Sequence, residues 1–162
     1  MTDTTTSHGE RVAIITGASR GLGLALARDL AARGWRLVLD ARGGESLGRA
    51  GAELGGRTTV VAVTGDVADE GHRTRLVAEA ARLGRLDLLV NNASVLGPSL
   101  QPALADYPLD ELRRVYEVNV VAPLRLVQLA LPLLEPAGGR VVNVTSDAAR
   151  ERYAGWGGYG SS

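Results

Sequence analysis

Residues 12–23 read VAIITGASRGLG, an apolar run followed by a turn that holds three glycines. The next residues, 24–30, are rich in Leu and Ala and predict a helix. Gly17, Gly21 and Gly23 have no Cβ, so the backbone can turn sharply and approach a ligand closely. A helix N-terminus also offers free N–H groups and partial positive charge to a phosphate. The stretch therefore predicts a strand, a glycine turn and a helix that together cradle the pyrophosphate of a dinucleotide.

The chain has the size of one domain. It has 162 residues, of which 45% are hydrophobic, and this is enough for a substantial core. Eighteen basic and 18 acidic residues balance, and no basic block indicates nucleic-acid binding. There is no cysteine, which excludes disulfides and thiolate metal sites, and we expect no metal. We expect a disordered lead-in at residues 1–10 and one dinucleotide-binding domain over residues 11–162.

The sequence predicts no targeting or membrane segment. Its N-terminal residues are polar and lack the apolar core of a signal peptide. Polar side chains and two prolines interrupt the apolar run at 118–134, which argues against a membrane span. His8 and His72 have polar neighbours in sequence, and we expect both to be solvated. By default the protein is expected to be soluble and cytoplasmic.

Strand-like and helical patterns alternate along the chain. The apolar runs predict strands at 12–15, 36–40, 58–64, 86–90 and 140–145. Helical spacing predicts helices at 24–30, 45–54, 69–83 and 109–134. The last helix is expected to bend near Pro123 and Pro132. Strands joined by helical crossovers predict an α/β fold with a doubly wound, Rossmann-like parallel sheet of five strands, which binds ligands at the carboxyl ends of its strands.

With these positions in place, the chain resembles the N-terminal part of the short-chain dehydrogenase/reductase family, in its shorter single-domain class. The matching motifs follow one another in the family's order and spacing. They are TGASRGLG at 16–23, Asp66-Val67 after the third strand, NNA at 91–93, Asn119 in the long helix, Ser146 after the fifth strand and Tyr159 thirteen residues later. One departure is Ser94, which stands where the family usually has glycine and narrows the space beside the cofactor.

The resemblance implies hydride transfer between a nicotinamide and the carbon of a carbonyl or alcohol. It makes Tyr159 the acid/base, has Ser146 hydrogen-bond the substrate oxygen, and has Asn119 position a water in the proton path. The cofactor-binding residues that it implies are Gly17, Ser19, Gly21, Leu22, Gly23, Asp66, Val67, Asn92 and Ala93. Ser146 and Asp66 also have a purely structural explanation, because each of them could simply cap a helix.

The family's remaining catalytic residue is a lysine four residues after the tyrosine. That position would be residue 163, and the sequence ends at Ser162. All eighteen basic residues are arginine, whose wider guanidinium would need another backbone placement to replace the lysine. We therefore expect the chain as given to be weakly active or inactive. Without the family's C-terminal strands and helices, the strand at 140–145 is also expected to be an exposed edge.

Two signals compete over the choice of dinucleotide. Asp40 lies near the distance, about 20 residues beyond the glycine turn, at which an acidic residue binds the ribose 2′-hydroxyl of NAD. In the family, however, the discriminating position comes just after the second strand, where Ala41 and Arg42 stand. Arg20 and Arg42 could bind a 2′-phosphate through charge-assisted hydrogen bonds, which favours NADP. NAD stays open, because a shift of one residue would bring Asp40 to the ribose.

Two functions of different classes are consistent with these features. The first is an NADP-dependent dehydrogenase or reductase acting on a small carbonyl or alcohol, with no nucleic-acid or membrane partner, and a homo-oligomer in its full-length form. The second is a truncated, non-catalytic nucleotide-binding or interaction module. An epimerase or dehydratase of the family's extended branch fits less well, because that branch spaces its glycines differently.

Overall fold

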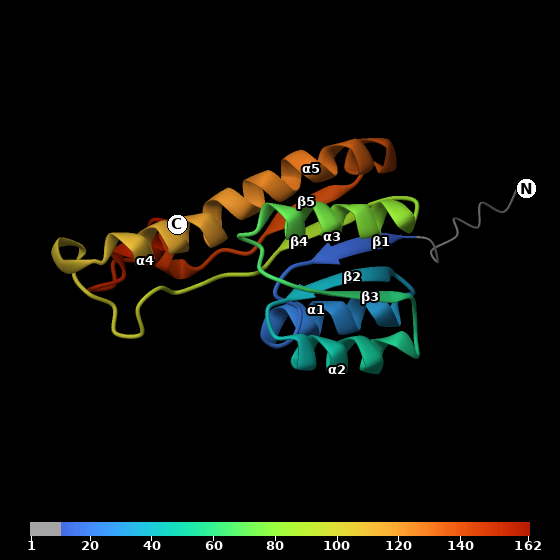
Figure 1. The fold of residues 1–162 in the computed structure, drawn as a ribbon, viewed down its shortest axis with the longest axis horizontal. Coiled ribbons are helices and arrows are strands. Elements are labelled where there is room, and N and C mark those ends of the chain that lie inside the picture. Colours follow the sequence, from blue (N-terminus) through green and yellow to red (C-terminus); the bar gives the residue numbers. More distant parts are fainter. Residues whose placement is uncertain (1–10) are drawn as a thin grey trace, which may run out of the picture.

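The computed structural model describes residues 11–162, so the expected lead-in at residues 1–10 lies outside the described residues. Five parallel strands form one central sheet in the order β3-β2-β1-β4-β5 (Figure 1). The strands are β1 (Val12–Ile15), β2 (Arg36–Ala41), β3 (Val60–Thr64), β4 (Leu88–Asn91) and β5 (Arg140–Asn143). The helices between them are α1 (Gly21–Ala32), α2 (Gly44–Gly55), α3 (Glu70–Arg82), α4 (Leu109–Tyr116) and α5 (Ala122–Ala137). The predicted doubly wound α/β fold is thus confirmed.

The central strand β1 shows how the sheet buries both of its faces. All four of its residues are fully buried, and their side chains alternate between two hydrophobic clusters. Val12 and Ile14 belong to the cluster that includes residues of α3 and α5. Ala13 and Ile15 belong to the cluster that includes residues of α1 and α2. In Figure 1, α1 and α2 accordingly lie on one side of the sheet, and α3 and α5 on the other.

The long helix expected at 109–134 is present, but it changes its hydrogen-bonding pattern in the middle. A π-helical turn at Glu117–Val121 separates α4 from α5. Pro123 follows this turn in the first positions of α5, and it has no N–H to donate to the carbonyl of Asn119, four residues earlier. In a π-helical turn the N–H groups bond carbonyls five residues earlier, so the turn accommodates the bond that Pro123 cannot make. Pro132, where a second bend was expected, lies inside α5.

The C-terminal part of the chain differs most from the expected elements. The fifth strand ends at Asn143 instead of residue 145, and all four residues of β5 are exposed at the edge of the sheet, as predicted. Two short elements were not predicted, a 3-10 turn at Asp147–Ala149 and the helical turn α6 at Gly157–Gly160. A further 3-10 turn, Leu104–Asp106, lies in the loop between β4 and α4. Such short turns carry too few residues for a periodic pattern.

One helical stretch meets the length and composition of a membrane span. The continuous helix Leu109–Ala137 has 29 residues, and the mean hydropathy of its most apolar window is 1.4. The sequence had argued against a span because polar residues interrupt this run. Core helices of globular proteins meet the same criterion, and Leu126, Ala130 and Leu134 of α5 belong to the buried cluster beside α3. The finding is therefore weak evidence for a membrane segment.

Candidate active site

The glycine turn after β1 is fixed to the neighbouring strand β4. Thr16 Oγ1 donates to the carbonyl of Val90 (3.3 Å) and accepts the N–H groups of Asn92 and Ala93 (both 2.9 Å). The Asn92 side chain returns two hydrogen bonds, from Nδ2 to the carbonyls of Thr16 (2.8 Å) and Gly17 (3.1 Å). The NNA motif therefore holds the glycine turn against β4.

Glycine is required at different positions of the turn for different structural reasons. Gly17 and Gly21 adopt φ values of +65° and +56°, a region that side chains disfavour. Gly23 lies in α1, where a Cβ would come within 2.5 Å of the Gly17 carbonyl oxygen and 2.6 Å of Asn92 Nδ2. Gly21 is exposed and a Cβ there would meet open space, so the N-terminus of α1 is accessible to a ligand.

A cavity of about 550 Å³, which we call the cofactor cavity, lies beside this turn at the carboxyl ends of the first strands. It brings together nine of the eleven residues predicted to bind the cofactor. They are Gly17, Ser19, Arg20, Gly21, Arg42, Asp66, Val67, Asn92 and Ala93. Leu22 and Gly23 lie outside its lining.

Asp66 lines the cofactor cavity without capping a long helix. Its Oδ1 accepts the N–H of Ala68 (3.0 Å), and Asp69 instead caps α3 by accepting the N–H of His72 (2.6 Å). Its Oδ2 accepts a hydrogen bond from Arg114 of α4. Partial burial pushes the pKa of Asp66 upward, but the bonds from Ala68 and Arg114 outweigh this and hold that pKa below its usual value.

Arg114 is a residue of the cofactor cavity that the sequence reasoning missed. It lies 48 residues from Asp66 along the chain, and no motif marks it. The signal that was available is the strongly amphipathic pattern of α4, with its paired arginines at 113 and 114.

The expectation that His72 is solvated was wrong. His72 is buried, and its Nε2 lies 2.8 Å from Oδ1 of Asp40, which is also buried. His72 precedes Leu76 and Ala80 at helical spacing on the buried face of α3, and this spacing could have identified it. The other histidine, His8, lies outside the described residues. Because Asp40 is engaged below the surface, its carboxylate is not placed to bind a ribose in this structure.

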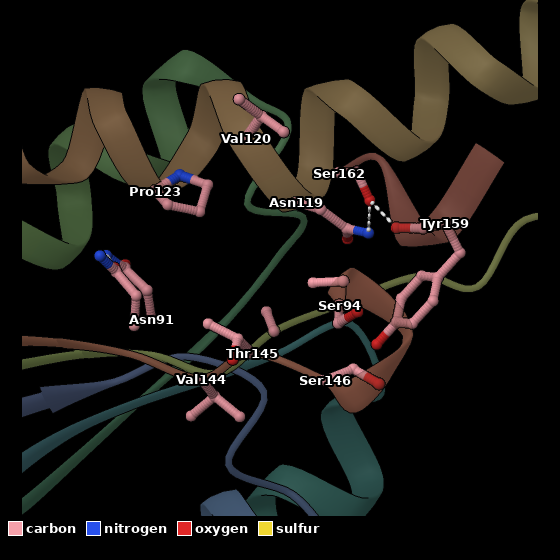
Figure 2. A pocket seen from close by; sticks show the side chains of 13 residues that line it. Asn91, Ser94, Asn119, Val120, Pro123, Val144, Thr145, Ser146, Tyr159 and Ser162 are labelled. Atoms are coloured by element: carbon pink, nitrogen blue, oxygen red, sulfur yellow. Dashed lines mark hydrogen bonds between the residues drawn. The ribbon is translucent and has the colours of Figure 1, made fainter. Parts of the chain in front are cut away.

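A second cavity of about 320 Å³, which we call the catalytic cavity, collects the predicted catalytic residues. Asn119, Ser146 and Tyr159 all line it, although they come from the π-helical turn, the end of the sheet and α6. In Figure 2 the Tyr159 hydroxyl points toward Ser146. Residues far apart in the sequence thus face one space, as the resemblance implies.

Ser146 caps a short turn and also lines the catalytic cavity. It caps the 3-10 turn Asp147–Ala149, because its Oγ accepts the N–H of Ala148 (3.2 Å). The same Oγ donates to Oδ1 of Asp147 (3.0 Å) while it lines the catalytic cavity. Hydrogen bonds from Tyr153 and Ser146 lower the pKa of Asp147, so this carboxylate is a stable acceptor that orients the serine.

Asn119 fastens the π-helical turn to the loop that follows β4. Its Oδ1 accepts the N–H of Val95 (2.9 Å) and its Nδ2 donates to the carbonyl of the same residue (3.0 Å). Nδ2 also donates to Oγ of Ser162 (2.9 Å), which in turn donates to the carbonyl of Tyr159 (2.8 Å; Figure 2). A line of polar atoms therefore connects Asn119 with the segment that carries Tyr159.

Glycines allow that segment to pack closely. A Cβ on Gly158 would come within 2.4 Å of the Tyr107 ring, and one on Gly160 within 2.5 Å of the Ala148 carbonyl oxygen. On the same segment, the ring of Trp156 packs edge-on against Tyr159, with 5.9 Å between centroids. The sequence GWGGYG thus fixes the tyrosine by close backbone packing and one aromatic contact.

The two cavities adjoin. Ala93 and Ser94, which lie two and three residues after the end of β4, line both of them. The donors in the cofactor cavity, which are the open N-terminus of α1 and the exposed guanidinium groups of Arg20 and Arg42, suit the phosphates of a dinucleotide. The described residues therefore fit a nicotinamide dinucleotide that extends past Ser94 toward Tyr159. Within residues 11–162, no group of three or more His, Cys, Asp or Glu is placed to hold a metal ion.

Comparisons with known proteins agree with this geometry. The sequence model of the short chain dehydrogenase family matches residues 11–162. A short chain dehydrogenase of Penicillium thymicola is 32% identical over 86% of this chain and 53% of the relative. The 1-deoxy-11-beta-hydroxypentalenate dehydrogenase of Streptomyces exfoliatus is 41% identical over 79% of this chain and 47% of the relative.

Solved structures show the same similarity. An alcohol dehydrogenase of the archaeon Thermococcus sibiricus, complexed with 5-hydroxy-NADP, has a TM-score of 0.85 and 33% identity, over 93% of this chain and 64% of that protein. The KRED1-Pglu enzyme has a TM-score of 0.85 and 36% identity, over 93% of this chain and 62% of that protein. The chain spans about half the length of the curated relatives described above.

Proposed function

Since the chain belongs to the short-chain dehydrogenase family of oxidoreductases, we propose that it carries the cofactor-binding and proton-transfer residues of an NADP-dependent reductase or dehydrogenase. The observation that carries this proposal is the junction of the two cavities at Ala93 and Ser94. A dinucleotide held at the glycine turn would reach the space that Asn119, Ser146 and Tyr159 line. The substrate class is a small molecule with a carbonyl or alcohol group.

Tyr159 is the proposed acid/base. When bound, the nicotinamide supplies a hydride to the carbonyl carbon or takes one from the alcohol carbon. In the reductive direction Tyr159 Oη gives its proton to the substrate oxygen, and in the oxidative direction it accepts one. Ser146 Oγ turns its proton from Asp147 to the substrate oxygen and holds that oxygen at the tyrosine. We place the proton path along the polar atoms between Asn119 and Tyr159, where Asn119 positions a water.

Replacing Tyr159 by Phe tests this assignment. The Tyr159→Phe variant keeps the ring but loses the proton, so turnover should fall by about 10²- to 10⁴-fold. The measurement is NADPH consumption by the protein with a panel of ketones and aldehydes, together with the dissociation constant for NADP, which should not change. A variant that keeps the original rate contradicts the assignment. NADP binding without turnover does not by itself favour the non-catalytic module, because the chain as given is already expected to be weakly active or inactive.

The preference for NADP rests on Arg20 and Arg42. Both are exposed and both line the cofactor cavity. Asp40 lines it too, but its side chain is buried and hydrogen-bonded to His72. The archaeal alcohol dehydrogenase whose fold is similar was solved with an NADP derivative. A guanidinium that contacts a 2′-phosphate contributes about 1.5–3 kcal/mol, so Arg42→Ala should weaken NADP binding by about 10- to 100-fold.

The affinity of that variant for NAD should stay unchanged, because NAD lacks the phosphate. Arg49→Ala is the matched control, since Arg49 is an exposed arginine of α2 that pairs with Glu45 and does not line the cavity. Isothermal titration with both dinucleotides decides the matter. Tighter binding of NAD than of NADP by the unmodified protein would overturn the preference.

The remaining features of the proposal concern the whole protein. We propose that residues 11–162 act as one domain, that the protein is soluble in the cytoplasm, and that its full-length form is a homo-oligomer. The family and the apolar side chains exposed along α5 support the last point. The balanced charge of 18 basic and 18 acidic residues favours neither a nucleic acid nor an anionic membrane surface as a partner.

A further inference from the structure

The buried pair Asp40–His72 lies under the cofactor cavity and has no part in the proposed chemistry. The side chain of Asp40 is 2% exposed and that of His72 is 4% exposed, and their hydrogen bond measures 2.8 Å. Asp40 is in the second-last position of β2, and His72 is in the first turn of α3. Burying a carboxylate is costly unless hydrogen bonds compensate, so the pair calls for an explanation.

The pair joins three parts of the cofactor site. The N–H of Gly17 hydrogen-bonds the Asp40 carboxylate, and the N–H of Ala18 donates to the Asp40 carbonyl (2.8 Å). The glycine turn is therefore attached to β2 through both the side chain and the backbone of Asp40. His72, held in the first turn of α3 by its backbone bond to the Asp69 carboxylate, ties the same carboxylate to α3.

The residue opposite His72 leaves room for its ring. Gly65 follows β3, and a Cβ there would come within 2.2 Å of His72 Nδ1. Nδ1 has no hydrogen-bond partner among the described residues. The His72 ring therefore makes its one side-chain hydrogen bond among the described residues through Nε2, to Asp40. Burial raises the pKa of Asp40, while the bonds from His72 and Gly17 act in the opposite direction.

Asp40, Ala41 and Arg42 lie along one wall of the cofactor cavity, so the Asp40 carboxylate, although buried, borders it. Without the bond from His72, a buried carboxylate would turn toward solvent, and the cofactor cavity is the open space that Asp40 borders. In that position it would accept a hydrogen bond from a ribose 2′-hydroxyl and repel a 2′-phosphate. Arg20 and Arg42 have the opposite effect, because their positive charges favour the 2′-phosphate.

We propose that Asp40 and His72 form a positioning pair for cofactor selection, in which His72 holds the Asp40 carboxylate out of the cavity and leaves the ribose end to Arg20 and Arg42. This inference rests on the proposed function, because it concerns the same dinucleotide site. It assigns His72 a role in selectivity although His72 does not line the cavity.

The test measures dissociation constants for NADP and NAD by titration calorimetry, which requires no turnover. In His72→Leu the carboxylate loses its side-chain donor and keeps only the Gly17 N–H, so NADP should bind about tenfold more weakly and NAD more tightly than in the unmodified protein. In the double variant Asp40→Val/His72→Leu the carboxylate is gone, and the original ratio of the two constants should return. In His72→Gln the side-chain amide can still donate to Asp40, so the ratio should stay near the original.

A purely structural role gives a different pattern. It predicts that His72→Leu weakens both dinucleotides equally and that the double variant does not restore the ratio, and either result overturns the inference. Thermal unfolding of each variant shows whether it folds, and His72→Ala, which also removes the ring donor, replaces His72→Leu if the latter does not fold. In that case equal weakening of both dinucleotides overturns the inference, and weaker NADP binding together with tighter NAD binding supports it.

The experiment distinguishes a failure of the proposed function from a failure of this inference. If the unmodified protein prefers NAD, the NADP proposal fails, yet the change of ratio between the unmodified protein and His72→Leu still tests the pair. If the unmodified protein binds neither dinucleotide, both the proposed function and the inference are overturned.

Discussion

Gly23 marks the point where the first helix comes closest to the glycine turn. The sequence analysis assigned it to cofactor binding, but the structure puts it outside the lining of the cofactor cavity and against the Gly17 carbonyl and Asn92. Gly23 is therefore required for the close packing of α1 against the glycine turn. A side chain at this position would push α1 away from the turn whose N–H groups are proposed to bind phosphate.

The substitution Gly23→Ala tests this explanation. We expect it to lower the free energy of unfolding by about 1–3 kcal/mol, because the added Cβ overlaps backbone and amide atoms that cannot easily move. Gly48→Ala is the matched control, since Gly48 lies inside α2 with open space around its Cβ position. That change should raise stability by about 0.4–1 kcal/mol through the unfolded state. Urea unfolding measures both, and equal effects of the two variants would contradict the packing argument.

At the scale of elements, α3 and the π-helical turn are joined by a buried arginine. Arg73 of α3 donates to the carbonyl of Val67 (2.7 Å) and to the Glu117 carboxylate in the π-helical turn (3.1 Å). It also pairs with Glu70 on its own helix (3.0 Å). The same turn carries Asn119, so Arg73 links the wall of the cofactor cavity at Val67 to the wall of the catalytic cavity.

We expect Arg73→Met to destabilise the protein by about 1–3 kcal/mol, because it leaves the Val67 carbonyl without its donor. Glu117 is partly exposed, so water can solvate its freed charge and the loss stays moderate. Arg75→Met provides the comparison on the same helix, because Arg75 is exposed. Its effect should stay within about 0.5 kcal/mol. Chemical denaturation measures both changes, and a cost for Arg75→Met as large as that for Arg73→Met would refute the role of the buried link.

For the whole molecule, the helix α5 presents apolar side chains on two sides. One side packs into the core through Leu126, Ala130 and Leu134. Away from the core, Leu124 and Leu131 are 59% and 41% exposed. Val121, just before α5, is 44% exposed. Apolar surface of this kind is consistent with the homo-oligomer that we propose.

The substitution Leu124→Glu probes this surface. If α5 takes part in self-association, the added charge should shift the protein toward the monomer, as measured by light scattering after size-exclusion chromatography. Leu100→Glu is the control, because Leu100 is even more exposed (90%) but lies in the loop between β4 and α4. Its mass should match that of the unmodified protein. An unmodified protein that is monomeric at all concentrations tested would disprove the proposal.

The sequence by itself determined the order of the strands and helices and the glycine turn. These depend on local rules: an apolar strand buried on both faces reads as a continuous run, and a turn with positive φ selects glycine at positions 17 and 21. The resemblance to the short-chain dehydrogenase family implied that Asn119, Ser146 and Tyr159 act together, and the structure gathers them in one cavity. The π-helical turn was not foreseen, because Pro123 was read as a bend.

Only the tertiary structure decided which partners the polar side chains take. Asp40 meets His72 from 32 residues away, and Asp66 meets Arg114 from 48 residues away. From the sequence, Asp40 was expected to compete for the ribose and His72 to be solvated. Both expectations came from neighbours along the chain, which do not reveal contacts between distant residues. Hydrogen-bond partners are fixed by the packing of separate elements against one another, and a buried pair such as Asp40–His72 cannot exchange its partner for water.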